Sequence, residues 1–443
     1  NSAGQSVPAG HRLSEADYLT NFADIHTPLD ARSAVIEADR CYYCYGAPCQ
    51  TACPTDIDVP SFIRMISEKN EVGAAGKILS ENIMGGTCAR ACPVETLCED
   101  ACVRNTEDDR PIQIGLLQRF ATDRASELGA KFFTRKAATG YSVAIVGAGP
   151  AGLSCAHRLA TLGHDVVIYE AQEKSGGLNE YGLAAYKMAG DYAQKEVENI
   201  LSIGGITIKH GIKVGEDVSS AELQTNYDAV FMGVGLGNSK DIQLDGEHAS
   251  GVVNAVDYIH QLRQAEDLGQ LPVGHDVVVI GGGMTAIDIA IQIKRLGAAN
   301  VTIAYRRGKE HMNASLKEQE FALNEGVHIA HWAKPVSLQI EQGTITGVEF
   351  NKANIEGGET YITPTNMLFK AIGQSLTPIN MGTIEFVKAS GKYEVDDELR
   401  TSQPGFWAGG DCVAESDDLT VSAVQDGKLA ALSIHKSLTQ SQA

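Results

Sequence analysis

The sequence predicts a multidomain protein with a cysteine-rich α-helical domain followed by two dinucleotide-binding domains of the doubly wound, Rossmann-like α/β class. Three observations predict this fold class. Eight of the ten cysteines lie between residues 41 and 102. An apolar strand near residue 141 runs into a glycine-rich turn and a helix, and the same pattern recurs near residue 276. Glycine-rich strand–turn–helix units of this kind bind dinucleotides.

Size and composition are those of an ordinary globular protein of several domains. The 443 residues are 43% hydrophobic and 21% charged. The net charge of −20 argues against nucleic acid or an anionic membrane as a partner. No apolar run is long enough to cross a membrane, and no signal-like segment precedes the first domain. Crowded cysteines beside nucleotide-binding motifs fit a reducing compartment better than disulfides, so we expect a cytoplasmic protein.

The cysteines form two groups with the spacing of iron–sulfur ligands. The first group is Cys41-x2-Cys44-x4-Cys49-x3-Cys53-Pro54, and the second is Cys88-x3-Cys92-Pro93 followed by Cys98 and Cys102. Ferredoxin-type runs place closely spaced cysteines on one cluster, while the last cysteine, followed by proline, binds a different cluster. We therefore predict two 4Fe–4S clusters with crossed ligation. Two four-cysteine zinc sites would use as many thiolates, but this spacing fits zinc ribbons poorly.

Helical periodicity surrounds the cysteines. Apolar residues between the two groups show helical spacing that is broken near Asn70, which predicts a helical hairpin that brings the groups together. A further helix is expected over 112–128, with Gln118 facing inward, and the first 35 residues read as an arm or leading helix. A basic, polar linker follows at 131–141, so the arm and the helical domain are assigned to residues 1–137.

The first glycine-rich motif has the full context of a dinucleotide fingerprint. A strand enters Gly147-x-Gly149-x-x-Gly152, a helix follows to Leu162, and the next strand ends at Glu170. The glycines let the pyrophosphate approach backbone N–H groups at the helix N-terminus, and the acid can accept hydrogen bonds from ribose hydroxyls. The cofactor-binding residues predicted here are Gly147, Gly149, Pro150, Ala151, Gly152 and Glu170.

The second fingerprint differs at the end of its second strand. That strand, 300–305, ends in Arg306 and Arg307 in place of an acid, which favours the 2′-phosphate of NADP over NAD. We expect Asp288, on the helix after the fingerprint, to be a solvated or capping acid. The binding residues predicted here are Gly281, Gly283, Met284, Thr285, Ala286, Arg306 and Arg307.

A late motif shows that the first dinucleotide domain is split. Gly410-Asp411 precedes a helix expected from Thr420, and such an acid can bind the ribityl chain of FAD while the helix N-terminus stabilises negative charge on the flavin. We therefore assign FAD to residues 138–240 and 376–443, and NAD(P)H to an inserted domain at 241–375. Glycine-rich crossings at 233–235 and 372–374 would be the hinges. Further predicted cofactor contacts are Gly177, Leu178, Gly235, Gly373, Gly410, Asp411, Thr420 and Val421.

Together these motifs resemble the N-terminal half of dihydropyrimidine dehydrogenase, and nearly the whole chain from about residue 36 is similar to the separate bacterial NAD(P)H-oxidising subunit of that family. The small subunit of glutamate synthase shares the architecture but has a shorter gap between its second-group cysteines. The gap here, from Cys92 to Cys98, matches the pyrimidine enzyme.

The resemblance implies particular cluster ligands. One cluster would be held by Cys41, Cys44, Cys49 and Cys102, and the other by Cys53, Cys92, Cys98 and Gln118. Motif counting alone would choose Cys88 in place of Gln118, but the family's Ile-Gly-x-Leu-Gln segment matches residues 114–118. Cys88 then becomes a buried thiol. A neutral amide ligand makes the cluster less negative, which raises its reduction potential.

The resemblance also implies the reaction. NADPH or NADH would pass a hydride to FAD, and single electrons would leave through the clusters. The acceptor would be a separate FMN-containing barrel subunit with its own iron–sulfur clusters, which reduces uracil or thymine in a hetero-oligomer. No residue of this chain would act as acid, base or nucleophile, and Cys155 and Cys412 are expected to be packed thiols.

Two positions depart from the family pattern. Lys187 lies where the family has an arginine in a proline-flanked loop near the flavin, and it keeps the positive charge. Asn313 lies where NADPH-specific relatives carry a further arginine, which leaves NADH open as the coenzyme. Two other functions also stay open. One is a glutamate synthase small subunit, and the other is a non-catalytic interaction subunit in which the clusters are structural.

Overall fold

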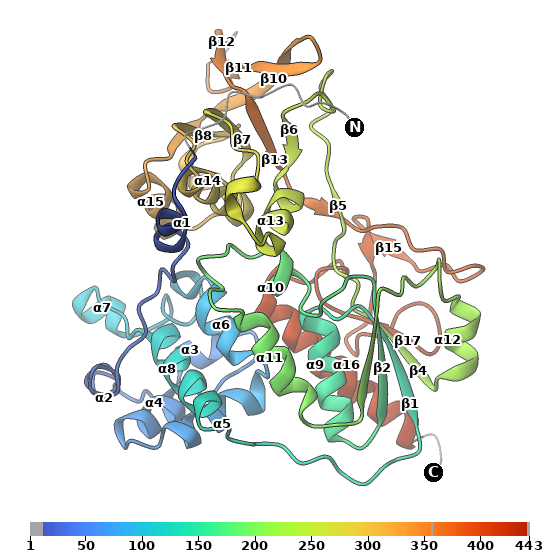
Figure 1. Ribbon diagram of the computed structural model, residues 1–443. Coiled ribbons are helices and arrows are strands. Elements are labelled where there is room, and N and C mark those ends of the chain that lie inside the picture. The colour runs from blue at the N-terminus through green and yellow to red at the C-terminus, as the bar shows by residue number, and fades with distance from the viewer. Residues whose placement is uncertain (1–11, 356–357, 441–443) are drawn as a thin grey trace. The chain divides into compact units, whose positions relative to one another are not determined.

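The computed structural model describes residues 12–355 and 358–440 (Figure 1), which fall into two compact units. The larger unit comprises His26–Glu180, Gly190–Gly237 and the described residues from Leu376 onward. The smaller unit comprises the segment that ends at Ile25, together with Tyr181–Ala189 and Asn238–Ser375.

The larger unit begins with short helices around the cysteines. They are α2 (Ala31–Ala38), α3 (Pro48–Thr51), α4 (Val59–Ser67), α5 (Glu71–Glu81), α6 (Gly85–Ala91), η1 (Val94–Thr96), α7 (Arg104–Asp108) and α8 (Ile114–Glu127). The predicted hairpin is α4 and α5, which pack against each other. Asp58 caps α4, and Asn70, where the periodicity broke, caps α5. The buried face of α4 (Phe62, Ile63, Ile66) joins α8 in one core.

The rest of the larger unit is a parallel five-stranded sheet with helices. The elements are β1 (Ser142–Val146), α9 (Pro150–Thr161), β2 (Asp165–Glu170), α10 (Leu178–Tyr181), α11 (Tyr192–Leu201), β3 (Ile206–His210), α12 (Ser220–Asn226), β4 (Ala229–Met232), β15 (Lys388–Ala389), β16 (Lys392–Tyr393), β17 (Phe406–Ala408) and α16 (Thr420–Gln440). The strand order is β17-β4-β1-β2-β3. Figure 1 shows α9, α11 and α16 on one side of this sheet and α12 on the other.

Strand β1 shows why the sheet is buried on both faces. Val143 and Ile145 contribute to the core beneath α9 and α16, whereas Ala144 and Val146 contribute to a core on the opposite face. Successive side chains of a strand face opposite sides of the sheet, so apolar residues at every position indicate a parallel strand that is covered on both sides. Helices α9 and α16 approach very closely, because a Cβ at Gly427 would lie 2.1 Å from the carbonyl oxygen of Ala151.

The smaller unit repeats the plan in a second parallel sheet of order β6-β13-β7-β8-β9. Its elements are α1 (Glu15–Asn21), β5 (Asn238–Ser239), β6 (Val252–Asn254), α13 (Ala255–Gln264), η2 (Leu268–Gln270), β7 (Asp276–Gly281), α14 (Met284–Arg295), β8 (Asn300–Tyr305), η3 (Lys309–His311), α15 (Leu316–Asn324), β9 (His328–His331), β10 (Ala333–Glu341), β11 (Thr344–Lys352), β12 (Thr360–Pro364), β13 (Met367–Ala371) and β14 (Gln374–Ser375). Val277 and Val279 face α13 and α14, while Val278 and Ile280 face the antiparallel β10-β11-β12 sheet.

Two segments distant in sequence belong to this smaller unit. Tyr18 of α1 and Tyr186 are buried in the same core as α14. The side chain of Asn21 donates a hydrogen bond to the carbonyl oxygen of Arg295 at 2.9 Å, and Arg295 returns one to the Asn21 carbonyl at 2.8 Å. The leading helix and the 181–189 segment are thus fastened to the second dinucleotide fold by core packing and reciprocal hydrogen bonds.

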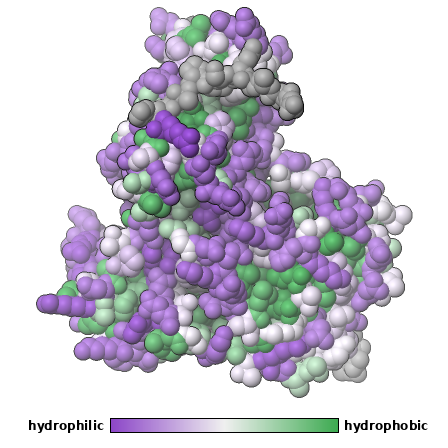
Figure 2. Space-filling model, in the orientation of Figure 1, coloured by the Kyte–Doolittle hydropathy of each residue, from purple (hydrophilic) through white to green (hydrophobic). Residues whose placement is uncertain are grey.

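The face of the molecule drawn in Figure 2 is mainly polar. Hydrophilic residues cover most of the face shown in Figure 2, in keeping with the net charge of −20. None of the described helices is both long enough and apolar enough to cross a membrane.

Candidate electron-transfer site

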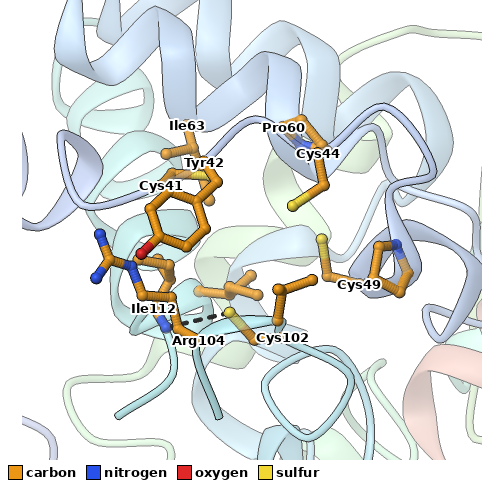
Figure 3. A pocket seen from close by; sticks show the side chains of 12 residues that line it. Cys41, Tyr42, Cys44, Cys49, Pro60, Ile63, Cys102, Arg104 and Ile112 are labelled. Carbon is orange, nitrogen blue, oxygen red and sulfur yellow. Dashed lines mark hydrogen bonds between the residues drawn. The ribbon is translucent and has the colours of Figure 1, made fainter. Parts of the chain in front are cut away.

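Three cysteines of the first group and one of the second line a single pocket. Cys41, Cys44, Cys49 and Cys102 surround it, together with apolar side chains that include Ile63 (Figure 3). Two of the sulfurs accept backbone hydrogen bonds. Cys41 accepts from Tyr43 N–H at 3.4 Å, and Cys102 accepts from Ile112 N–H at 3.5 Å. Burial, followed by the neighbouring Cys41 and Cys102, raises the pKa of Cys49 to about 11. The fold therefore brings these four sulfurs together across the two groups.

The remaining cysteines of both groups gather deeper in the domain. A hydrogen bond with Cys88, then burial and the charges of Cys88, Cys98 and Cys53, raise the pKa of Cys92 well above that of an ordinary thiol. Cys98 likewise has its pKa raised by burial and by Glu99, Cys53 and Cys49. Cys53 of the first group therefore lies with Cys92 and Cys98 of the second. This crossing is the arrangement that the predicted ligand sets require.

Both candidates for the eighth ligand lie close to helix α6. Gln118 is buried, and its side-chain nitrogen donates to the carbonyl oxygen of Gly85 at 2.7 Å, at the start of α6. Cys88, within α6, is also buried, and its sulfur accepts a hydrogen bond from the Asn82 amide at 3.2 Å. The choice of Gln118 over Cys88 stays a prediction. Nothing in the sequence had indicated that Asn82 contacts a cysteine of this site.

Helix α6 is anchored to the first dinucleotide fold by a buried acid that the sequence did not reveal. Glu196, on α11, accepts hydrogen bonds from the N–H groups of Gly86 and Thr87 at 3.0 Å each, and from the Thr87 hydroxyl. Arg90 of α6 stacks over the Tyr192 ring at 3.4 Å and pairs with Asp123 at 2.7 Å. Burial raises the pKa of Glu196 to about 7, although the Thr87 hydrogen bonds and Arg90 oppose this.

The predicted FAD-binding residues of the first fingerprint lie around the β1–α9 turn. A Cβ at Gly152 would lie 2.0 Å from the carbonyl oxygen of Gly147, so only glycine fits. Gly177, just before Leu178 of α10, crosses Gly149 so closely that a Cβ there would lie 2.8 Å from the Gly149 Cα. Glu170 ends β2 with its carboxylate accepting from Ala148 N–H at 2.7 Å. Gly149 is the N-cap of α9, which begins with Pro150 and Ala151.

The predicted residues near the C-terminus lie in the same unit. Gly410 and Asp411 follow β17, and Thr420 and Val421 begin α16. Burial, followed by the neighbouring Asp418, raises the pKa of Asp411 to about 6. Gly235 lies in the loop after β4 and has a left-handed backbone with φ of 61°. Asp426, which the sequence did not single out, accepts from Gly410 N–H at 2.8 Å.

The predicted NAD(P)H-binding residues lie in the smaller unit. Gly281 ends β7, and a Cβ there would lie 2.1 Å from the Ala371 carbonyl oxygen. Gly283 is the N-cap of α14, which begins Met284-Thr285-Ala286, and a Cβ at Gly283 would meet open space. Arg306 and Arg307 follow β8 and are exposed, without an ion pair in the described ranges. Gly373 lies between β13 and β14.

Lys187 and Asp288 form a buried ionic network in that unit. The Lys187 ammonium lies 2.8 Å from Asp288 and 3.0 Å from Glu318, and the Tyr186 hydroxyl donates to Asp288 at 3.2 Å. Burial alone lowers the pKa of Lys187, but the two carboxylates outweigh it and raise that pKa. The expectation that Asp288 is a solvated or capping acid was wrong, because the packed 181–189 segment covers it and supplies its cation.

Comparisons with known proteins account for both parts of the chain. A family model described as dihydropyrimidine dehydrogenase domain II, 4Fe-4S cluster, matches residues 18–130. A second, described as pyridine nucleotide-disulphide oxidoreductase, matches residues 141–427, more than half of the chain. The chain belongs to the pyridine nucleotide-disulphide oxidoreductase family. It carries an N-terminal 4Fe–4S domain of the dihydropyrimidine dehydrogenase type.

The relatives of this oxidoreductase match along its length. The NAD-dependent dihydropyrimidine dehydrogenase subunit PreT of Salmonella typhimurium is 36% identical over 97% of this chain and 99% of its own. The glutamate synthase NADPH small chain of Escherichia coli is 33% identical over 93% of this chain and 92% of its own. The resemblance inferred from the cysteine spacing and the fingerprints is confirmed.

The fold class is confirmed as well. A thioredoxin reductase from Lactococcus lactis, 22% identical, superposes with a TM-score of 0.55 over 68% of this chain and 99% of its own. At this identity the likeness shows the fold alone. The chain is an NAD(P)H-dependent flavoprotein oxidoreductase with an iron–sulfur domain. The thiols of Cys155 and Cys412 are buried, as expected for packing residues.

The residues fit the flavin and nicotinamide dinucleotides of this oxidoreductase family. The N-cap residues of α9 and α14 are glycines, and no side chain of the described residues caps either helix, which leaves N–H groups for pyrophosphate. At the start of α16, Ser422 Oγ and Gln425 Oε1 are buried polar atoms without a hydrogen-bond partner in the described part of the chain. Neither was predicted, and both are suited to a bound polar group such as the flavin.

The cysteine sites fit clusters in the same way. No group of three or more His, Cys, Asp or Glu side chains in the described ranges is arranged around a point that would hold one metal ion. The four sulfurs of the first site instead surround a pocket, which is the requirement of a cube of iron and sulfide. The 4Fe–4S domain is thus supported by sequence and by pocket chemistry.

Proposed function

We propose that this chain is the electron-input subunit of a dihydropyrimidine dehydrogenase that reduces uracil or thymine to the 5,6-dihydropyrimidine. In this proposal NAD(P)H is oxidised here, and single electrons pass through two 4Fe–4S clusters to a separate FMN-containing barrel subunit in a hetero-oligomer. Residues 138–240 and 376–443 would hold FAD, and residues 241–375 the nicotinamide coenzyme. When bound, FAD supplies the conversion from a two-electron hydride to the single electrons that clusters carry.

The observation that carries the proposal is the crossed grouping of sulfurs. Cys102 lies with Cys41 and its neighbours, while Cys53 lies with Cys92 and Cys98. The two proposed centres therefore share one small domain, which favours electron transfer between them. The deeper site lies toward the FAD fold, because α6 contacts α11 and α16. The shallower site opens beside Tyr42, which is 52% exposed. Electrons would thus move from the FAD fold to the deep site and then to the surface site.

A glutamate synthase small subunit is the second candidate, and the 33% identity to that chain favours it. Affinity purification from the native host, followed by cofactor analysis, separates the two. We expect an FMN-containing partner of single-barrel size, and uracil-dependent NAD(P)H oxidation by the complex. A far larger, glutamine-cleaving partner would support the second candidate. Reduction of a dye by NADPH or NADH with the isolated chain would exclude a non-catalytic subunit.

The arginine pair gives a prediction on coenzyme choice. Replacing both Arg306 and Arg307 by alanine is expected to raise the KM for NADPH by about 10- to 100-fold, since hydrogen bonds to charged groups contribute about 1.5–3 kcal/mol. The KM for NADH should change less than threefold. Steady-state dye reduction measures both values. Lys317→Ala removes an exposed cation of the same unit as a control. An equal rise in KM for NADPH and NADH would show that Arg306 and Arg307 do not bind the 2′-phosphate.

A further inference from the structure

The surface cysteine pocket opens beside two exposed tyrosines. Tyr42 lines the pocket and is 52% exposed, and Tyr45, next to Cys44, is fully exposed. Figure 3 shows the Tyr42 ring at the edge of the pocket next to Arg104. Exposed tyrosines beside this pocket are suited to a protein interface, because tyrosine is enriched among the residues that dominate binding energy.

The loop that carries these tyrosines is held in one conformation. Tyr43 and Ala47 have left-handed backbones, with φ of 50° and 38°, which cost energy for residues with a Cβ. The Tyr43 hydroxyl donates to Ser67 Oγ at 3.1 Å, which secures the loop to α4. The Arg104 guanidinium stacks on the Tyr42 ring at 4.1 Å, and its Nε donates to the Arg40 carbonyl oxygen at 2.8 Å. A partner would therefore lose little conformational entropy when it covers the Tyr42 ring.

Acidic side chains flank the tyrosines. Asp39, Glu107 and Asp109 are exposed, and none forms an ion pair within the described residues. Asp108 is different, because it pairs with Arg104 at 2.9 Å and lies 3.8 Å from Arg40. The nearby cations Arg40 and Arg104 pair with Glu37 and Asp108, and Arg110 lies 3.7 Å from Glu37. The exposed Arg64 stacks over the Tyr43 ring at 4.7 Å. The three unpaired acids outnumber this one cation, so the face carries an excess of negative charge. Such a surface attracts a basic partner and accelerates its association at low ionic strength.

We propose that Tyr42, Tyr45, Asp39, Glu107 and Asp109 form the docking face for the electron-accepting subunit, and that this subunit presents a basic rim around its own redox centre. The inference rests on the proposed function and adds the place and chemistry of the contact. Cys41, Cys44, Cys49 and Cys102 would hold the cluster beside this face, from which single electrons would pass to an iron–sulfur centre of the partner. NAD(P)H supplies the electrons in pairs, so two such transfers follow each hydride.

The experiment measures binding of the reconstituted chain to its purified partner by calorimetry at low and high salt, and electron transfer by stopped flow. Tyr45→Ser is expected to weaken binding about 10- to 100-fold, as loss of a central aromatic contact does. The triple variant Asp39→Lys, Glu107→Lys, Asp109→Lys should weaken binding similarly and abolish the decrease of the association rate with salt. Dye reduction by NAD(P)H should stay within twofold of the wild type.

Matched controls are Leu323→Ser for the apolar change and the triple variant Glu198→Lys, Glu341→Lys, Asp397→Lys for the charge change, since all four residues are exposed elsewhere. Wild-type affinity and salt dependence in both test variants would overturn the docking face. It would also be overturned if Tyr45→Ser only converted a dimer of this chain to monomers, as seen by sedimentation. If the wild type co-purifies with a glutamine-cleaving subunit, the proposed function fails, and the same variants measured against that subunit decide the docking face separately.

Discussion

Replacing Cys98 by alanine is expected to remove the deep iron–sulfur centre and to lower NAD(P)H-driven transfer to one-electron acceptors by more than about 100-fold. Cys98 lies with Cys53 and Cys92, and its pKa is raised by burial and by Glu99 and the neighbouring sulfurs. A thiol in such surroundings stays protonated unless a metal centre displaces the proton. Its sulfur is therefore suited to binding a metal centre and not to acting as a reactive thiol in solvent.

Iron and acid-labile sulfide analysis after anaerobic reconstitution measures the loss. We expect about eight iron atoms in the wild type and about four in Cys98→Ala, while reduction of the flavin by NAD(P)H continues at its normal rate. Cys155→Ala is the matched control, because it removes a buried thiol of helix α9 that lies outside both sulfur groups. A Cys98→Ala protein with its full iron content would contradict the ligand set.

The same analysis decides between the two candidates for the eighth ligand. Cys88→Ala is expected to keep its iron, whereas Gln118→Leu should lose part of it or shift the potential of one cluster in a redox titration. Gln118→Glu keeps an oxygen ligand but adds negative charge, so it should lower that potential. Loss of iron in Cys88→Ala alone would reverse the assignment.

Replacing Glu196 by alanine is expected to lower the free energy of unfolding by about 3 kcal/mol or more at pH 6, because three donors of Gly86 and Thr87 would be left buried without an acceptor. These donors lie at the start of α6, which carries Cys88 and leads to Cys92. Loosening α6 should therefore also disturb the deep cluster. Glu198→Ala, an exposed acid on the same helix, is the control.

Glu196 should also make stability depend on pH in a defined direction. Burial raises its pKa to about 7, above the value of about 4.5 in the unfolded chain. The folded state then binds the proton of Glu196 more tightly than the unfolded state does. The resulting contribution to the free energy of unfolding is fully present below pH 4.5 and is lost as pH rises through 7. The shift corresponds to roughly 3 kcal/mol.

Glu196→Gln tests this dependence because it cannot ionise. The difference in unfolding free energy between the wild type and Glu196→Gln should fall by up to about 3 kcal/mol from pH 5 to pH 8. Urea unfolding at four pH values measures it. A constant difference across that range would show that Glu196 does not change its protonation there, and the pKa assignment would be withdrawn.

Most of the organisation of this protein follows from its sequence. The two fingerprints, at Gly147 and Gly281, specify strand, turn and helix because no other residue allows the backbone approach seen at these turns. Strand β1 carries apolar residues at every position, which indicates burial on both faces. The spacing of the cysteines, with proline after Cys53 and Cys92, predicted the crossing of the two groups. Each of these features involves residues close together in the sequence, so it can be recognised without the structure.

Only the tertiary structure decided which distant partners meet. Asp288 was expected in solvent because nothing near it in the chain marks it as buried, and its cation, Lys187, comes from a segment about a hundred residues earlier. Glu196 was missed for the same reason, since the N–H groups that donate to its carboxylate lie on a helix more than a hundred residues away. Sequence periodicity determines which face of an element is buried. It does not determine which polar groups will be brought together, because desolvation and hydrogen bonding act on the folded arrangement and carry no local pattern.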